Sequence, residues 1–102
     1  MDKEQRAVCG DIADYYGKAK QEVQAVQELS ELICLLTRRP DQRGVEYTSC
    51  LIGELADVAI MAEQIRQLHG ITLPEISDRI DYKLHRQQER IKFEEAGGGI
   101  TV

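Results

Sequence analysis

Apolar and polar residues recur along this chain with the three-to-four-residue period of amphipathic helices. The pattern predicts four helices, which span residues 3–16, 18–38, 48–69 and Thr72 or Leu73 through 94. The clearest loop covers residues 39–44, because Pro40 and Gly44 both interrupt helices there and the stretch is polar. Pro74 and Glu75 suit the first turn of the fourth helix. Residues 96–102, which include three consecutive glycines, are expected to form a flexible tail.

The inward faces of the second and third helices follow from projecting each helix at about 100° per residue. The apolar arc of the second helix is expected to face the protein interior, and it contains Ala25, Val26, Leu29, Leu32, Ile33 and Leu36. The corresponding face of the third helix contains Leu51, Leu55, Val58, Met61, Ala62 and Ile65. The sequence therefore predicts an all-α fold, a four-helix bundle in one domain over residues 1–95.

Four carboxylates lie on or beside these predicted inward faces. Glu54 projects into the middle of the face of the third helix, and Asp57 lies on its margin. Glu28 falls at the edge of the arc of the second helix, with Glu31 one turn further along. The loop between the helices is short enough to make them antiparallel neighbours, so both acidic pairs are expected to face one cavity.

Carboxylates gathered in one cavity repel each other and raise each other's pKa values. A divalent cation with oxygen ligands removes that conflict, and Mg²⁺ is expected because it binds carboxylates together with water and phosphate oxygens. Mn²⁺ would satisfy the same ligands. A metal-activated water could then attack a phosphorus atom. One such acidic pair is common on solvated helix faces, but two pairs on adjacent inward faces are more specific.

Length, net charge and cysteine content exclude several classes of protein. A chain of 102 residues is near the lower size limit for an adequate core, so oligomerisation is expected to complete the bundle. The net charge of −5 argues against binding a nucleic-acid polymer. Three widely spaced cysteines fit neither a disulfide framework nor a zinc site. Because no signal peptide or membrane-spanning stretch is evident, we expect a soluble, cytoplasmic protein that does not engage membranes.

Basic and amide side chains offer candidates for substrate contact. Lys83, Arg86 and Arg90 recur at spacings of three and four and form one stripe, which suits either a triphosphate clamp or a solvated helix face. The second helix adds further candidates, for which a plain surface position is an equally valid interpretation: Lys18, Lys20, Gln21, Gln24 and Gln27.

Four stretches of the sequence carry a resemblance: Tyr15-Tyr16-Gly17, Gln-Glu-Leu-Ser-Glu-Leu at 27–32, Gly-Glu-Leu-Ala-Asp-Val-Ala-Ile-Met at 53–61 and Tyr-Lys-Leu-His-Arg at 82–86. Over about residues 12 to 91 the chain resembles the MazG-like all-α nucleoside triphosphate pyrophosphohydrolases. The resemblance implies Mg²⁺-dependent cleavage between the α- and β-phosphates of a nucleoside triphosphate, which releases a nucleoside monophosphate and pyrophosphate. It also implies homodimers or homotetramers with active sites at or near the subunit interface.

Matching positions imply roles for six residues: Glu28, Glu31, Glu54 and Asp57 as metal ligands, and Lys83 and Arg86 near the triphosphate. The chain departs from the family pattern at Gln27 and Gly53, where the family often has an additional acid. We therefore expect one metal ion. The predicted function is a nucleotide pyrophosphohydrolase that removes unwanted nucleoside triphosphates. The alternative is a non-catalytic helical module, either a nucleotide sensor or an oligomeric adaptor.

Overall fold

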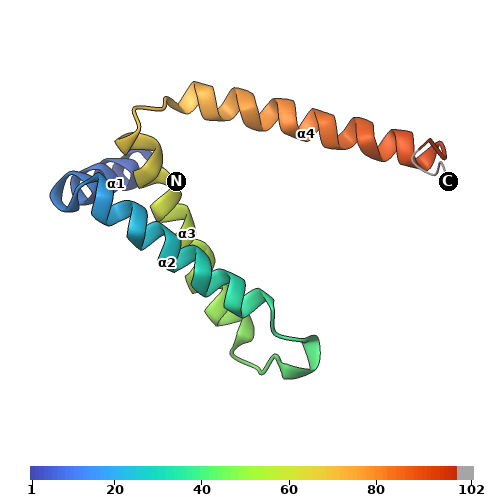
Figure 1. Cartoon of the computed structure of the whole chain (residues 1–102), viewed down its shortest axis with the longest axis horizontal. Coiled ribbons are helices and arrows are strands. Elements are labelled where there is room, and N and C mark those ends of the chain that lie inside the picture. Colours follow the sequence, from blue (N-terminus) through green and yellow to red (C-terminus); the bar gives the residue numbers. More distant parts are fainter. Residues whose placement is uncertain (99–102) are drawn as a thin grey trace. The chain divides into compact units, whose positions relative to one another are not determined.

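The computed structural model describes residues 1–98, which are helical throughout apart from short connections (Figure 1). The elements are α1 (Lys3–Tyr16), α2 (Lys18–Leu36), a 3₁₀ turn η1 (Pro40–Gln42), α3 (Tyr47–Leu68) and α4 (Leu73–Glu95). No strand occurs in this range, so the all-α prediction is confirmed. The helix boundaries lie within two residues of those predicted. Residues 99–102 of the predicted tail lie outside the described residues.

Local capping explains where the helices begin and end. Asp2 accepts a hydrogen bond from the Gln5 backbone N–H at 2.8 Å, and the Gln5 side chain accepts one from the Asp2 N–H. Thr72 and Glu75 form the same reciprocal capping box at the start of α4. Gly17 separates α1 from α2 with a φ of +86°, a conformation that glycine adopts without steric cost.

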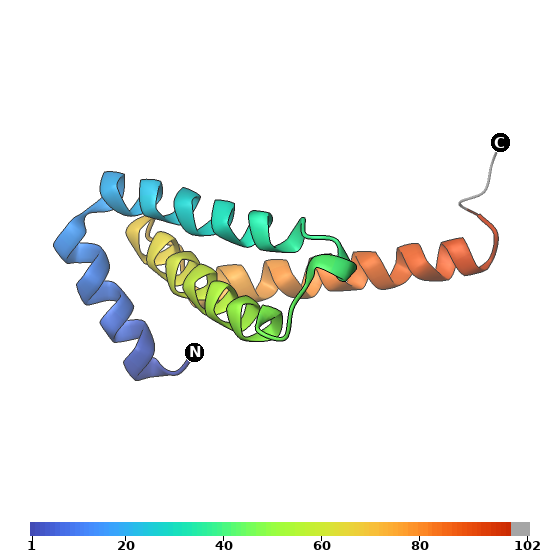
Figure 2. The ribbon, with the colours of Figure 1, turned by 90° about the horizontal axis from the view of Figure 1, so that it is seen from below.

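The chain divides into two compact units, Met1–Gly70 and Ile71–Val102. In the first unit α2 and α3 form an antiparallel hairpin, and α1 packs mainly against α3 (Figures 1 and 2). In the second unit the described residues form α4, whose side chains are exposed. The prediction of a single domain over residues 1–95 stays a prediction.

The core of the first unit is small and partly polar. Its fully buried apolar residues, within residues 1–98, are Cys9, Ala13, Leu35 and Met61. Gln21 of α2 and Gln64 of α3 are 5% and 2% exposed, and the Gln21 Nε2 donates to the Gln64 Oε1 at 2.7 Å. Such a buried polar pair is satisfied only in one alignment of the two helices, so it favours a unique register.

The predicted inward faces are wrong for several residues. Four residues of the α2 arc are between 47% and 63% exposed, namely Val26, Leu29, Ile33 and Leu36. Two residues of the predicted α3 face are exposed as well, Leu55 at 51% and Ala62. The buried or half-buried side of α2 contains Gln21, Ala25, Glu28, Leu32 and Leu35, of which Ala25 and Leu32 were predicted to face inward. Apolarity alone displaced the predicted face, because the buried side includes Gln21, which donates to Gln64 across the hairpin.

The exposed apolar residues of the hairpin form a surface that we call the outer apolar face. It comprises Val26, Leu29, Ile33, Leu36, Ile52 and Leu55. Projection at 100° per residue puts the members from both helices on the same side of the antiparallel pair. Exposed apolar side chains gathered on one side of a hairpin are a common feature of protein–protein interfaces.

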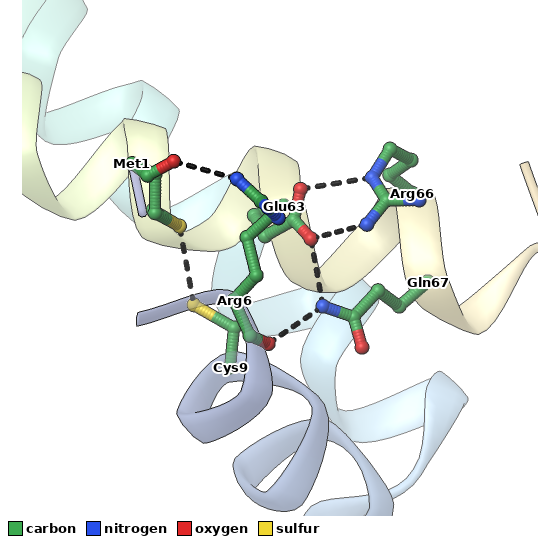
Figure 3. A network of polar contacts seen from close by, with 6 residues as sticks. All are labelled: Met1, Arg6, Cys9, Glu63, Arg66 and Gln67. Carbon is green, nitrogen blue, oxygen red and sulfur yellow. Dashed lines mark hydrogen bonds and ion pairs between the residues drawn. The ribbon is translucent and has the colours of Figure 1, made fainter. Parts of the chain in front are cut away.

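A polar network joins α1 to α3 (Figure 3). Gln67 of α3 donates from its Nε2 to the Arg6 carbonyl oxygen at 2.8 Å and to the Glu63 Oε2 at 2.7 Å. The Arg66 Nε donates to the Glu63 Oε1 at 2.8 Å. A Cβ added at Gly10 would lie 2.5 Å from the Gln67 Oε1, so the glycine allows this close approach of α1. The donors to Glu63 both lie on α3, and Glu63 thereby holds Gln67, whose hydrogen bond to Arg6 crosses to α1.

Replacing Glu63 with Gln is expected to destabilise the protein by about 1–2 kcal/mol at pH 7. The hydrogen bond from Arg66 lowers the pKa of Glu63, the one from Gln67 and the charges of Arg66 and Arg6 lower it further, and together they outweigh desolvation. A carboxyl whose pKa is lowered on folding stabilises the native state above its unfolded pKa, and this contribution is lost as pH falls through the folded value. Urea unfolding between pH 7 and pH 3 measures both effects.

The matched control is Glu89→Gln, because Glu89 makes only an exposed ion pair with Lys92 at 3.4 Å. We expect this variant to retain both the stability and the acid dependence of the parent chain. If Glu63→Gln loses stability below pH 4.5 as steeply as the parent, Glu63 does not contribute to the acid dependence.

Candidate metal centre

Three predicted carboxylates come together between α2 and α3. Glu28 of α2 and Glu54 and Asp57 of α3 each offer one oxygen, and these oxygens lie within 4.8 Å of one another. The antiparallel packing of the hairpin brings them together from two distant parts of the sequence. Glu31 is not a member of this group, although it lines an adjoining pocket with Glu54. We call Glu28, Glu54 and Asp57 the acidic trio.

Two oxygens of the trio are buried without a hydrogen-bond donor. The Oε2 atoms of Glu28 and Glu54 are inaccessible to solvent, and no described residue donates to them. The other oxygen of Glu28 accepts a hydrogen bond from the Gln24 Nε2 at 2.9 Å. A buried carboxylate oxygen with no donor or cation is costly, and most buried polar atoms in proteins have a partner. These two atoms lack the partner that most buried oxygens have, and a cation is one group that would supply it.

Burial and mutual repulsion raise the pKa values of two members. Desolvation is the main cause of the raised pKa of Glu54, and the negative charges of Glu31 and Asp57 add to it. For Glu28 the hydrogen bond from Gln24 lowers the pKa, but desolvation and the charges of Glu31 and Asp57 raise it by more. A carboxyl whose pKa is raised on folding opposes folding once it ionises, so its cost is present above the folded pKa. A bound cation would remove this cost.

The donor set of the trio suits a hard divalent cation. All three residues supply carboxylate oxygens, and the group contains no nitrogen or sulfur ligand. Mg²⁺ and Mn²⁺ prefer such oxygens, whereas Zn²⁺ sites more often use histidine or cysteine. Cys9, Cys34 and Cys50 are free thiols outside the trio. The residues present therefore fit the predicted Mg²⁺, with Mn²⁺ as a substitute.

A pocket of about 360 Å³ adjoins the trio between α2 and α3. Glu31 and Glu54 line it together with Arg38 and Cys50. Sequence analysis missed Arg38 and Cys50 as candidate site residues. Arg38 lies beyond the end of α2 at Leu36, so the helical repeat of the sequence does not place it in this pocket.

The candidate substrate residues of α2 have different surroundings. Gln24 holds Glu28 through the hydrogen bond described above, which places it beside the trio. Gln21 is buried against Gln64, which does not favour direct contact with a substrate. Lys18 is exposed at the first position of α2, about 15 Å along the helix axis from Glu28. The substrate-binding roles of all three stay predictions.

Lys83 and Arg86 are exposed on α4 and belong to the second unit. Both lie in α4 (Leu73–Glu95) at a spacing that puts them on one side of the helix. Their predicted contact with a triphosphate stays a prediction. His69 and His85 are exposed as well.

The two departures from the family pattern flank the acidic residues. Gln27 donates from its Nε2 to the Glu31 Oε1 at 3.5 Å. Gly53 is exposed, and a Cβ added there would meet nothing within 4 Å. Packing therefore leaves room for a side chain at position 53, and the absence of an acid there is not a steric requirement.

Comparison of the chain with family models, curated proteins and solved structures gave no match. The resemblance to the MazG-like family thus rests on the sequence stretches quoted above and stays a prediction. Among the described helices, none has the length and apolar character needed to span a membrane.

Proposed function

We propose that this chain is a Mg²⁺-dependent nucleoside triphosphate pyrophosphohydrolase of the MazG-like type. It cleaves a nucleoside or deoxynucleoside triphosphate to the monophosphate and pyrophosphate, and so clears surplus nucleotides. The observation that carries the proposal is the acidic trio, in which the Oε2 atoms of Glu28 and Glu54 are buried without donors. A cation held there would both satisfy these oxygens and attract a triphosphate to an otherwise acidic protein.

Each residue of the site would have its own role in holding the cation. Glu28, Glu54 and Asp57 hold the cation, and Glu31 supplies a fourth carboxylate beside them. The hydrogen bond from Gln24 to the Glu28 Oε1 fixes that carboxylate, which leaves the Oε2 for the cation. Bound Mg²⁺ supplies positive charge to phosphate oxygens and lowers the pKa of a bound water.

Lys83 and Arg86 of α4 are proposed to bind the negatively charged triphosphate. Lysine and arginine both bind phosphate oxygens, and their spacing on α4 allows them to act on one ligand. Both side chains are exposed and so are available to a ligand.

A second copy of the chain is proposed to cover the outer apolar face, which gives a homodimer or a homotetramer. The face exposes on the order of 500 Å² of apolar surface, at the upper end of what single-chain proteins leave uncovered. Two such faces in contact would bury on the order of 1,000 Å², which meets the lower limit for a specific interface. The small core of each chain makes this contribution to stability important.

Identification of the products tests the proposed reaction. The full chain is incubated with Mg²⁺ and a panel of eight nucleoside and deoxynucleoside triphosphates, and pyrophosphate and phosphate are measured separately. We expect pyrophosphate and monophosphate in equal amounts and no reaction when Mg²⁺ is chelated. Release of phosphate and a diphosphate would reject the proposed bond. Nucleotide binding with no product would instead favour the non-catalytic nucleotide sensor.

A further inference from the structure

The pocket beside the acidic trio extends away from the carboxylates toward the loop that joins α2 and α3. Glu31 and Glu54 line its acidic part. Arg38 and Cys50 line it as well, and both also border a second pocket of about 470 Å³ that reaches Tyr47. The two pockets share Arg38 and Cys50 in their walls and therefore adjoin, and we call them together the groove. Volumes of this size are typical of small-molecule sites.

Arg38 is the one basic residue that lines the first pocket, and its guanidinium is unengaged. Among residues 1–98 its side chain forms no ion pair and no hydrogen bond. Its backbone is engaged, since the N–H donates to the Leu35 carbonyl oxygen at 3.3 Å and the carbonyl oxygen accepts from the Arg43 Nε at 3.1 Å. Its neighbours are engaged, since Arg39 pairs with Asp41 at 3.5 Å and Arg43 lies over the Tyr47 ring. Five N–H donors of Arg38 are therefore available to a ligand.

The positions of the carboxylates and of Arg38 determine which end of a bound nucleotide lies at each. Phosphates belong at the acidic end, where a cation would hold them. Glu31 lies in the last two turns of α2, whereas Arg38 lies two residues beyond the end of this helix at Leu36, and both line the same pocket. Between them the wall includes Cys34, Leu35 and Cys50, which are suited to the faces of a planar ring. A second phosphate group at this end of the groove would face the apolar wall, with the guanidinium of Arg38 as its one positive charge. The base of the nucleotide therefore suits this end better.

The chemistry of Arg38 selects among the bases. A guanidinium donates two parallel hydrogen bonds and accepts none, so it pairs best with two adjacent acceptors. Guanine presents its O6 and N7 in this arrangement, whereas adenine presents an amino group beside its N7. We infer that the groove is a guanine-nucleotide subsite in which Arg38 reads the O6 and N7 edge. The inference rests on the proposed function for the placement of the phosphates.

Binding of nucleoside monophosphates to the full chain tests the subsite without turnover. Isothermal titration with dGMP, dAMP, dCMP and dTMP compares the parent chain with Arg38→Gln and Arg38→Lys. We expect dGMP to bind at least about tenfold more tightly than dAMP to the parent chain, which is the low end of the discrimination given by one bidentate pair. Arg38→Gln should reduce the ratio of dGMP affinity to dAMP affinity to about one. Arg38→Lys should retain little of this preference, because lysine cannot donate the two parallel hydrogen bonds of a guanidinium.

The matched control is Arg39→Gln, which removes the adjacent arginine outside the first pocket and should leave the ratio unchanged. Thermal melting checks that each variant folds. An equal dGMP and dAMP affinity in the parent chain, a tighter pyrimidine, or a ratio that survives Arg38→Gln would overturn the inference. The product assay separates the two proposals: guanine preference through Arg38 with no pyrophosphate release rejects only the reaction. Pyrophosphate release with no effect of Arg38→Gln on base preference rejects only the subsite.

Discussion

Replacing Glu54 with Gln is expected to lower kcat for pyrophosphate release by at least about a thousandfold. Glu54 is the half-buried member of the acidic trio on α3, and one of its oxygens has neither solvent nor a donor. The amide keeps the shape of the side chain but carries no negative charge for a cation. Steady-state kinetics with saturating Mg²⁺ and the preferred nucleotide measure the effect.

The same variant is expected to melt at a higher temperature than the parent chain when Mg²⁺ is chelated. The pKa of Glu54 is raised by desolvation and by the charges of Glu31 and Asp57, so the ionised carboxylate opposes folding at pH 7. The gain should shrink as pH falls toward 4.5 and the parent carboxyl becomes protonated. A residue that only supported the fold would show the reverse, a loss of stability on substitution.

Asp11→Asn is the matched control for both measurements, because Asp11 is an exposed acid of α1 outside the trio. It should retain full turnover. Undiminished turnover in Glu54→Gln would remove Glu54 from the site.

Replacing Ile33 with Asp is expected to weaken self-association by at least about a hundredfold, which converts the oligomer to monomers at micromolar concentration. Ile33 is 60% exposed in the outer apolar face, where a second copy is proposed to cover it. Burying an unpaired carboxylate in that contact costs several kcal/mol, and association weakens accordingly. Sedimentation velocity over a range of protein concentrations measures the change.

Val45→Asp is the control for this prediction, because Val45 is fully exposed outside the outer apolar face, in the segment between η1 and α3. It introduces the same charge and should leave the oligomer intact. A parent chain that sediments as a monomer at every concentration contradicts the proposed second copy. So does an Ile33→Asp variant that associates as tightly as the parent.

The helices of this chain were predictable because their signals are local. Asp2, Gly17, Thr72 and Pro74 act within one turn of their own positions, so a single sequence carries the necessary information. The acidic trio was also predictable, since Glu28, Glu54 and Asp57 follow the helical repeat and the hairpin loop is short. Glu31 was expected among the ligands from its spacing, and its role stays a prediction.

The orientation of the helices was harder to predict because it depends on partners distant in sequence. The apolar arc of α2 was expected to face inward, yet Leu29 and Ile33 are exposed and Gln21 is buried. The reason is the hydrogen bond from Gln21 to Gln64, which no pattern within α2 contains. Arg38 was missed for a similar reason, since the pocket that it lines exists only when α3 lies beside α2.

Binding of Mn²⁺ to the full chain, followed by electron paramagnetic resonance, tests the acidic trio most directly. The free ion gives a strong signal that weakens on binding, so the titration counts sites without requiring turnover. We predict one saturable site per chain that Mg²⁺ displaces, that Asp11→Asn retains and that Glu54→Gln loses. The absence of saturable binding in the parent chain, or undiminished binding in Glu54→Gln, would contradict a metal centre at Glu28, Glu54 and Asp57.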